Sequence, residues 1–551
     1  MATRPRDAGA DPDGERPSNL LVPDVDPWPV DEGRPIIELE GVTKRFGDVT
    51  VLEDLSLSIT PGEITVIIGS SGSGKSVLIK LMNSLLLPEE GTVRLFGDST
   101  TELSEPDLVR ARKRVGTLFQ SYALFDSKNL VENVAFPLVE NGVMSRAEAS
   151  QRAVELLERL ELGDALEKFP AELSGGMKKR VSLARSLVTN PEVLLFDEPT
   201  TGLDPILMEF VDQMIQSITD DYMLTSVIIS HDMASTFRLA DSIAVLYGGE
   251  IIAHDEPEAI RRTDDDRVAE LIRGTRKDDI DFSAAADLEL GERAEHAVEV
   301  EHLTKSFGDN LVLDDASMVV PKHAISVLIG ASGEGKSVLM KHILRLMEPD
   351  SGAVRVLGRD LATLSEREMR ELRTGVGMLF QHSALFDSMT VEENVAFPLI
   401  EQRGLSRAEA MDRVEEMADR LGIAHIREKH PSEISSGQAK RASLARALIT
   451  EPKLVIYDEP TTGQDPVMSR KVEEMVLEVQ EKFDVTSLVI SHNMSLTFRL
   501  ADHVAMLNEG TIIAEGPPAE LLRSDDPDVQ SFIFASDVGV GVGEDDEVAG
   551  G

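Results

Sequence analysis

The feature that most constrains the fold of this chain is an internal repeat that spans most of its 551 residues. Three segments of the first half recur in the second: KRFGD at 44–48 as KSFGD at 305–309, GSSGSGKS at 69–76 as GASGEGKS at 330–337, and FDEPTTGLDP at 196–205 as YDEPTTGQDP at 457–466. Positions 69 and 330, and positions 197 and 458, are both 261 residues apart, so the copies align without a gap. A period this long indicates a duplicated domain rather than a solenoid, whose repeats have roughly 20–50 residues.

Within each copy, short β-rich runs such as ITVIIG and SVIIS alternate with helical patterns such as RAEASQRAVELLERLEL. This alternation predicts an α/β domain in which strands lead into helices. The N-terminal stretch is rich in Pro, Asp and Gly, which is typical of a disordered tail. The predicted segments are a tail at 1–35, a first domain at 36–275, a polar and acidic linker at 276–296, a second domain at 297–535 and an acidic tail at 536–551.

Composition excludes several classes of function. The chain has no cysteine, which excludes disulfides, thiolate metal sites and iron–sulfur clusters. Its net charge of −44 argues against nucleic-acid binding through a broad basic face. No apolar run is long enough to cross a bilayer, and no signal peptide opens the chain, so we expect a cytoplasmic location.

Both copies contain the pattern G-x-x-x-x-G-K-S between a β-branched run and an apolar helical stretch. Glycines let such a loop fold its backbone N–H groups around phosphate oxygens. We expect Lys75 and Lys336 to reach the β- and γ-phosphates of ATP, and Ser76 and Ser337 to ligate Mg²⁺. The predicted loop residues are Gly69, Ser70, Ser71, Gly72, Ser73, Gly74, Lys75 and Ser76 in the first copy, and Gly330, Ala331, Ser332, Gly333, Glu334, Gly335, Lys336 and Ser337 in the second.

An acidic pair ends an apolar run downstream of each loop. Asp197 and Asp458 occupy the position that holds Mg²⁺ in P-loop enzymes, directly or through water. The residues that follow them, Glu198 and Glu459, are candidates for polarising the attacking water. An isolated acidic pair at a strand end usually faces solvent, but its place before PTTG in both copies favours catalysis.

His231 and His492 follow the next β-run in each copy. A lone histidine is more often structural than catalytic. Its position at the strand end after the acidic pair favours a contact with the γ-phosphate, and we count both histidines as candidate catalytic residues.

The segment LSGGM at 173–177 resembles the signature that defines ABC ATPases. This resemblance extends over nearly all of both halves. It implies tandem P-loop NTPase domains, each with a RecA-like α/β core and a helical subdomain. It further implies that each ATP lies between the P-loop of one half and the signature of the other, in an intramolecular pair rather than an obligate homodimer.

The resemblance adds site residues to those read from the loops. It implies a catalytic and Mg²⁺-binding role for Gln120 and Gln381. It implies nucleotide contacts by Ser174, Gly175, Gly176 and Asp204, and by Ser435, Ser436, Gly437 and Asp465. Phe46 and Phe307 match the position at which the family stacks an aromatic ring on adenine, although a core phenylalanine remains an alternative.

The second copy departs from the family pattern at two positions. Its signature reads ISSGQ, so Ser436 replaces the first glycine of that motif. Glu334 places an acid inside the second P-loop, where Ser73 stands in the first. The side chain of Glu334 can point away from the phosphates, whereas Ser436 adds a Cβ where a close backbone approach is expected, so we expect slower hydrolysis at one site.

The segments Gln120–Leu138 and Gln381–Leu399 share the pattern ALFD…NVAFPL, with an exposed apolar set that includes Leu124 and Phe125. The pattern resembles the ATPases of Mla/Mce-type lipid transport systems, whose membrane permease docks here. That resemblance implies a permease partner, a lipid-binding Mce-type component, and a peripheral location on the inner face of the cell membrane. The alternative for any single residue is a place in the core of the helical subdomain.

Two other classes remain open at this point. One is the motor of another importer, for example for amino acids. The other is a soluble twin-ATPase that acts on ribosomes or DNA. The short acidic linker and the absence of cysteine zinc sites count against this second class.

Overall fold

The computed structural model describes residues 34–118, 123–173, 175–222, 224–272, 295–308, 310–381 and 383–535. They fall into two compact units whose main division follows Ile272, and these are called the first and second domains below. Most of the predicted N-terminal tail, nearly all of the predicted linker and the C-terminal tail lie outside the described residues. The predicted boundaries of these segments therefore stay predictions.

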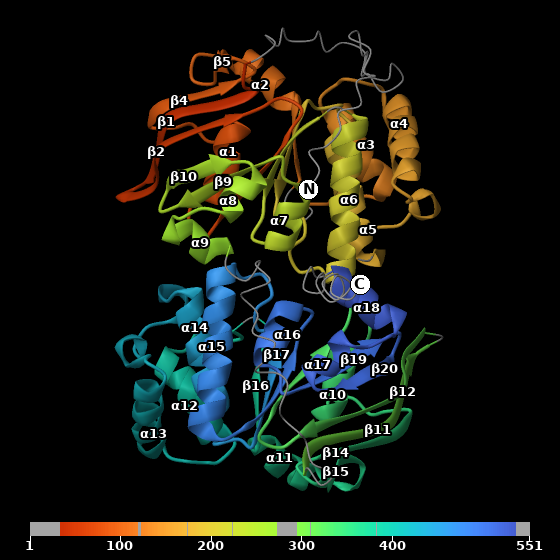
Figure 1. The fold of residues 1–551 in the computed structure, drawn as a ribbon, viewed down its shortest axis with the longest axis vertical. Helices are drawn as coiled ribbons and strands as arrows, with labels where there is room; N and C mark the ends of the chain where they lie inside the picture. The colour runs from red at the N-terminus through yellow and green to blue at the C-terminus, as the bar shows by residue number, and fades with distance from the viewer. Residues whose placement is uncertain are drawn as a thin grey trace, which may run out of the picture. The chain divides into compact units, whose positions relative to one another are not determined.

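The first domain combines two sheets with a group of helices (Figure 1). One sheet has the order β2-β1-β4-β5, and the other has the order β10-β9-β3-β8-β7-β6. The strands are β1 (Ile37–Phe46), β2 (Val49–Ile59), β3 (Ile64–Gly69), β4 (Glu90–Leu95), β5 (Asp98–Ser99), β6 (Val115–Leu118), β7 (Val193–Asp197), β8 (Thr225–Ile229), β9 (Ser242–Tyr247) and β10 (Glu250–Asp255). The helices are α1 (Lys75–Met82), α2 (Glu105–Lys113), α3 (Leu130–Glu140), α4 (Arg146–Arg159), α5 (Gly175–Leu187), α6 (Pro205–Asp221), α7 (Met233–Leu239), α8 (Pro257–Arg261) and α9 (Asp266–Ile272).

The second domain repeats this arrangement. Its sheets have the orders β12-β11-β14-β15 and β16-β17-β18-β13-β19-β20. The strands are β11 (His296–Phe307), β12 (Asn310–Pro321), β13 (Ile325–Ile329), β14 (Ser351–Val356), β15 (Arg359–Asp360), β16 (Val376–Leu379), β17 (Leu454–Asp458), β18 (Thr486–Ile490), β19 (His503–Asn508) and β20 (Thr511–Gly516). The helices are α10 (Lys336–Ile343), α11 (Glu366–Thr374), α12 (Val391–Glu401), α13 (Arg407–Arg420), α14 (Ser436–Leu448), α15 (Pro466–Phe483), α16 (Met494–Leu500), α17 (Pro518–Leu522) and α18 (Pro527–Ala535).

The burial pattern explains why the two sheets differ. Every residue of β3 and β8 is buried, as expected for parallel strands covered on both faces. In β2 buried and exposed positions alternate, which is typical of an antiparallel sheet with one solvated face. The four-stranded sheet, α1 and the six-stranded sheet share one apolar core.

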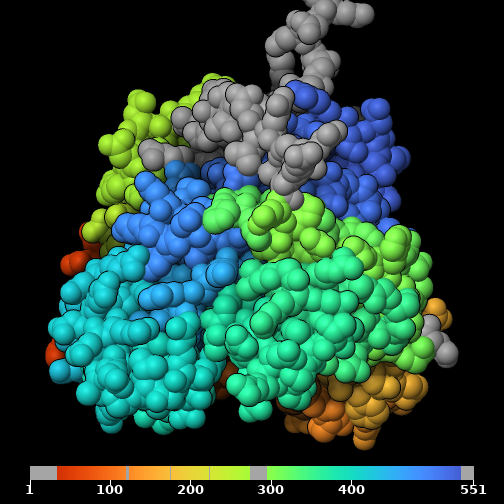
Figure 2. All heavy atoms as spheres, turned by 90° about the horizontal axis from the view of Figure 1, so that it is seen from below, coloured from red at the N-terminus to blue at the C-terminus, as the bar shows by residue number. Residues whose placement is uncertain are grey.

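A separate group of helices forms the second lobe of each domain. In the first domain α3 packs on α4 and α5, and in the second α12 packs on α13 and α14. Helix α4 begins with a capping box in which Ser145 and Glu148 bond each other's backbone N–H, and Ser406 and Glu409 do the same for α13. In Figure 2 the helical lobe of the second domain is cyan and its antiparallel sheet is green.

The predicted α/β fold with a helical subdomain is therefore confirmed for both halves. Parallel strands end together at one edge of each six-stranded sheet, so the P-loop, the acidic pair and the histidine share that edge. Among the described residues, no helix combines the length and the hydropathy needed to cross a membrane.

Candidate functional site

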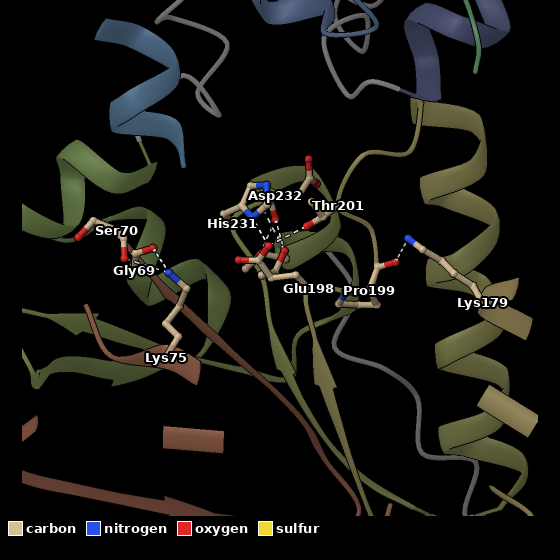
Figure 3. Close-up of polar contacts among 11 residues, drawn as sticks. Gly69, Ser70, Lys75, Lys179, Glu198, Pro199, Thr201, His231 and Asp232 are labelled. Carbon is tan, nitrogen blue, oxygen red and sulfur yellow. Dashed lines mark hydrogen bonds and ion pairs between the residues drawn. The ribbon is translucent and has the colours of Figure 1, made fainter. Parts of the chain in front are cut away.

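Each P-loop connects a buried strand to the start of a helix. In the first domain Lys75 opens α1, and its Nζ donates to the carbonyls of Gly69 at 2.8 Å and Ser70 at 3.0 Å. In the second, Lys336 opens α10 and donates to Gly330 and Ala331, both at 2.7 Å. Figure 3 shows Lys75 folded back over the loop.

Two glycines explain why the loop can turn so sharply. Gly74 and Gly335 precede α1 and α10 with φ angles of 105° and 103°. These left-handed angles favour glycine. A Cβ at Gly74 would meet Leu52 Cδ2 at 2.6 Å, so a larger residue does not fit.

The loop residues fit a phosphate and a cation. The hydroxyl of Ser73 is buried and has no hydrogen-bond partner among the described residues, so a ligand oxygen is a suitable partner. Ser76 and Ser337, the predicted Mg²⁺ ligands, are exposed at the second position of α1 and α10, near the buried lysines. The loop therefore combines a lysine cation with serine hydroxyls, which suit a phosphate and a metal ion.

The acidic pair lies where β7 ends. Glu198 has a φ of 53°, a left-handed angle that is uncommon outside glycine and that clusters at functional sites. Its N–H donates to Ile229 O at 3.0 Å, which joins it to the end of β8. Thr201 Oγ1 donates to Glu198 Oε2 at 2.9 Å, and His231 Nδ1 lies 3.3 Å from the same oxygen. Figure 3 shows this carboxylate between the two side chains.

The second domain repeats the arrangement. Glu459 has a φ of 47°, and its N–H donates to Ile490 O at 2.9 Å. Thr462 Oγ1 donates to Glu459 Oε2 at 2.8 Å, and His492 Nδ1 lies 2.9 Å from that oxygen. The structure thus brings both predicted histidines to the predicted glutamates, and it adds two threonines that sequence reasoning missed.

Burial and hydrogen bonding set the charges of the acidic pairs. Burial alone would raise the pKa of Glu198 and Glu459, but the hydrogen bonds and charge of their histidines, the hydrogen bonds from the threonines and the charge of the P-loop lysines together lower both. Burial, then the neighbouring glutamate, raises the pKa of Asp197 and Asp458. Each glutamate is therefore held as a fixed carboxylate.

Two buried lysines that sequence reasoning missed support this segment. Lys179 on α5 donates to the carbonyl of Pro199, and Lys440 on α14 donates to that of Pro460. Each proline directly follows the candidate glutamate, and Figure 3 shows the first of these contacts. Burial lowers the pKa of both lysines to about 8. Lys179 and Lys440 are 261 residues apart, so their recurrence at matching positions of the two copies could have identified them from the sequence.

The altered signature lies at the start of a helix. Ser436 is the first residue of α14, so its backbone is helical and does not require glycine at this position. Ser435 caps this helix: its Oγ accepts from Gln438 N at 3.3 Å, and its N–H donates to Gln438 Oε1 at 3.0 Å. Gly437 follows Ser436 in the first turn of α14, as Gly175 and Gly176 lie in that of α5, while Ser174 lies outside the described residues.

Glu334 turns away from the loop interior. Its carboxylate accepts the backbone N–H of Glu509, in the turn between β19 and β20. The acid in the second P-loop is therefore engaged with the protein itself, as expected from the sequence.

The remaining predicted residues lie at surfaces or helix ends. Phe46 and Phe307 are 49% and 47% exposed at the ends of β1 and β11, which rules out the core alternative. Asp204 and Asp465 are buried; their carboxylates accept from Leu207 N at 3.0 Å and Met468 N at 2.9 Å at the starts of α6 and α15. Gln381 is exposed just after β16, and Gln120 lies outside the described residues. Loop residues Ser71, Gly72, Ser332 and Gly333 are exposed.

The expected docking segment presents one aromatic pair in each domain. Phe125 is 40% exposed and packs against Phe136 in a tilted arrangement, with ring centroids 4.6 Å apart. Phe386 is 44% exposed and packs against Phe397 in the same way, with centroids 5.0 Å apart. Leu124 is half-buried, so it contributes less to this surface than the sequence suggested. We call these four rings the aromatic pairs.

Buried asparagines fix the loops that carry these rings. Asn133 is fully buried and accepts from Phe125 N at 2.8 Å. Its amide donates to the carbonyls of Phe125, Lys128 and Asn129 at 2.9–3.1 Å. Asn394 holds Phe386 in the same way. The exposed rings therefore lie on loops whose backbone is fixed by several hydrogen bonds.

The fold and the site define a P-loop NTPase with two tandem domains. The ABC transporter family model matches residues 52–201 and 313–462. The chain therefore belongs to the ABC transporter family, as an ATPase whose two ATP-binding domains are fused in one chain.

Several known proteins are similar to this chain. The oligopeptide transport ATP-binding protein OppD of Mycobacterium tuberculosis is 28% identical, over 88% of this chain and 96% of its own. The probable ribonucleotide transport ATP-binding protein mkl of Mycobacterium leprae is 38% identical, over 45% of this chain and 72% of its own. A dimeric ATP-binding cassette, MJ0796, bound to ADP and Pi, is 32% identical and covers 40% of this chain and 98% of its own, with a TM-score of 0.37.

Proposed function

We propose that this chain is the motor subunit of an ABC transporter, which couples ATP hydrolysis to a separate membrane permease. The observation that carries the proposal is the pair of matching sites, each with a P-loop lysine, a serine, an acidic pair and a histidine at one sheet edge. The aromatic pairs on rigid loops are the proposed contact with the permease.

The proposed chemistry assigns a role to each residue at the sheet edge. Lys75 and Lys336 hold the phosphates, and Ser76, Asp197 and their counterparts hold Mg²⁺. The metal, when bound, neutralises charge on the phosphates. Glu198 and Glu459 orient and polarise the attacking water, because their carboxylates are ionised and fixed. The histidines hold those carboxylates, and we propose that they also contact the γ-phosphate.

Fusion of the two domains favours pairing within one chain. A short linker gives each domain a high effective concentration of the other, roughly millimolar for flexible linkers. We propose that closure around ATP is intramolecular. Light scattering of the double variant Glu198→Gln, Glu459→Gln tests this, because it should show compaction with ATP and no doubling of mass.

For the cargo, we propose a lipid or another hydrophobic substrate, on the strength of the ALFD…NVAFPL pattern shared with Mla/Mce-type ATPases. An Mce-type lipid-binding component is then a further partner. The second candidate is a peptide or nucleotide substrate, which the names of the relatives OppD and mkl favour. In both cases the chain binds the cytoplasmic face of its permease.

The test uses membranes from cells that co-express a candidate permease. Replacing Phe125 and Phe386 together by serine should abolish co-sedimentation with these membranes and leave basal ATP turnover intact. The matched control is Val109→Ser, which changes a residue of α2 that is 42% exposed. Equal membrane binding by the double variant and the parent would overturn the docking proposal. Transport of a fluorescent phospholipid, against a labelled peptide or nucleotide, then decides the substrate.

A further inference from the structure

The second domain contains a cavity of about 570 Å³ that the ATPase mechanism does not use. Its lining includes Lys453, which precedes β17, and the segment 483–486, which leads into β18. These are the amino ends of parallel strands whose carboxyl ends carry Asp458 and the adjoining site. The cavity therefore opens at the sheet edge opposite the P-loop.

The charged residues around this cavity are mostly basic. Lys322, Arg420, Lys453 and Lys482 line it, together with only two carboxylates, Glu451 and Asp484. The whole chain has the opposite balance, with 55 Lys and Arg against 99 Asp and Glu. A positive lining on so acidic a protein attracts anions locally.

Some of these charges already have partners. Lys322 pairs with Glu295, and Lys482 pairs with Glu478. Of the two carboxylates in the lining, Asp484 lies 3.0 Å from His323 Nδ1. These contacts reduce the positive charge of the lining without removing it.

Lys453 and Arg420 carry the remaining positive charge of the cavity lining. Lys453 is exposed and forms no ion pair within the described part of the chain. The guanidinium of Arg420 lies 3.9 Å from the centroid of the Phe483 ring and donates to the backbone carbonyl of Lys482. Both cations remain available at the mouth of the cavity.

The first domain carries a buried arginine near the positions that correspond to part of this lining. There Arg114 is 3% exposed and lies 3.6 Å from the centroid of the Phe96 ring. Its Nη2 donates to Glu192 Oε2 at 2.7 Å. The residues 261 positions later are Gly375, Leu357 and Lys453. The second domain therefore has no side chain where the first has Arg114, and a lysine where the first has the glutamate that pairs with this arginine.

Two other lining positions carry a cation only in the second domain, while Glu451 and Asp484 stand where the first domain has Asn190 and Met223, so the net difference in the lining is still toward positive charge. The counterparts of Lys322 and Lys482 in the first domain are Pro61 and Asp221. A site for an external anion needs an open interior and cations around it. Absence of the buried Arg114–Glu192 pair from the second domain would not by itself account for Lys322 and Lys482, which the second domain also carries.

We propose that this cavity binds an organic anion with a flat apolar body and phosphate, sulfonate or carboxylate groups. Its volume lies within the range of roughly 300–1,000 Å³ typical of small-molecule sites. Leu357, Pro452 and Val485 supply apolar walls, and the cations at the rim supply charge. The inference does not depend on the transported substrate, because it concerns a different edge of the sheet.

The test measures binding of the aromatic tetraanion pyrenetetrasulfonate by fluorescence anisotropy, with the full chain kept in saturating Mg-ADP so that both P-loops are filled. The parent should bind one dye per chain, more weakly as salt rises. Lys453→Glu should weaken binding about tenfold or more, because it turns an attraction into a repulsion. Gly375→Arg should abolish binding, because its side chain would extend from a position whose Cβ lies 3.3 Å from Leu357 Cδ1, in the cavity lining.

A matched control is Lys429→Glu, which makes the same charge change at an exposed lysine outside the cavity. It should bind the dye like the parent. Far-UV circular dichroism confirms that each variant is folded, and Lys453→Glu keeps the test decisive if Gly375→Arg does not fold. Absence of dye binding by the parent, or equal losses in Lys453→Glu and Lys429→Glu, would overturn the proposal.

A second probe, vesicles containing phosphatidylglycerol, identifies the source of the anion. Vesicle binding that Lys453→Glu removes assigns the site to a lipid headgroup. Dye binding without vesicle binding assigns it to a soluble metabolite.

Discussion

The contact between Lys179 and Pro199 gives a prediction whose sign is not obvious. Burial lowers the pKa of this lysine from 10.5 to about 8. At pH 7 the buried charge therefore costs the folded state about 3 kcal/mol relative to the unfolded chain. Replacement by methionine removes that cost and fills similar space. It also leaves the Pro199 carbonyl without its donor, which costs about 1–3 kcal/mol. The two effects nearly cancel.

We therefore expect the double variant Lys179→Met, Lys440→Met to keep its stability within about 2 kcal/mol per domain. Its ATP turnover should fall about tenfold or more, because Pro199 and Pro460 adjoin the glutamates, and small misplacements of catalytic groups are costly. Both lysines are changed together, so that an intact site does not mask the loss.

The assays are urea unfolding and steady-state phosphate release, with Lys429→Met as the control at an exposed lysine. The pH dependence provides a further check. Because the folded-state pKa is depressed, the unfolded state binds more protons between pH 8 and about 10.5, and the parent should gain stability across that window. The double variant should lack this gain. Parental turnover, or a stability loss above about 3 kcal/mol per domain, would refute the balance described above.

Three further predictions concern the P-loops, one buried histidine and one buried asparagine. ATP turnover should fall about 10²-fold in the double variant Lys75→Ala, Lys336→Ala, and by a similar factor when Mg²⁺ is chelated from the parent. Phosphate release at the parental rate in either case would contradict the proposed chemistry. His503 is buried, and burial lowers its pKa to about 4. As the pH falls from 6.5 toward 4, this imidazole binds a proton in the unfolded chain but not in the folded one, so the free energy of unfolding falls. His503→Ser, which installs the first-domain residue, removes that loss, so its stability relative to the parent should be higher by roughly 2 kcal/mol at pH 5 than at pH 7.5. Equal shifts of the urea midpoint at the two pH values would contradict this prediction. Asn133→Ala should lower the unfolding free energy by about 2–3 kcal/mol and weaken membrane recruitment, and a loss below about 1 kcal/mol would show that the loop does not depend on this side chain.

The sequence allowed much of the fold to be predicted, because the repeat and the P-loop pattern carry local signals. The alternation of apolar runs and helical patterns predicted the α/β core, and the loop GSSGSGKS predicted the turn from β3 to α1. Glu198 and His231 were found because each follows a recognisable strand. Their mutual contact depends on neighbouring strand ends, which a parallel sheet brings together.

Other features depend on packing between distant segments and had no local signal. Lys179 reaches Pro199 only because α5 packs near the segment after β7. The difference between exposed Phe125 and half-buried Leu124 depends on the loop that Asn133 fixes. The cavity of the second domain is lined by Leu357, Lys453 and the segment 483–486, which are far apart in the sequence and are brought together only by the fold.

The constant spacing of 261 residues has a genetic consequence. In an ATPase assembled from two identical subunits, every mutation appears in both sites at once, so a change harmful to one is harmful to both. Here each half is encoded separately, so a substitution such as that at Ser436 or Gly375 arises in one half only. The two ATP sites, each built from parts of both halves, and surfaces such as the cavity of the second domain can therefore change independently of one another.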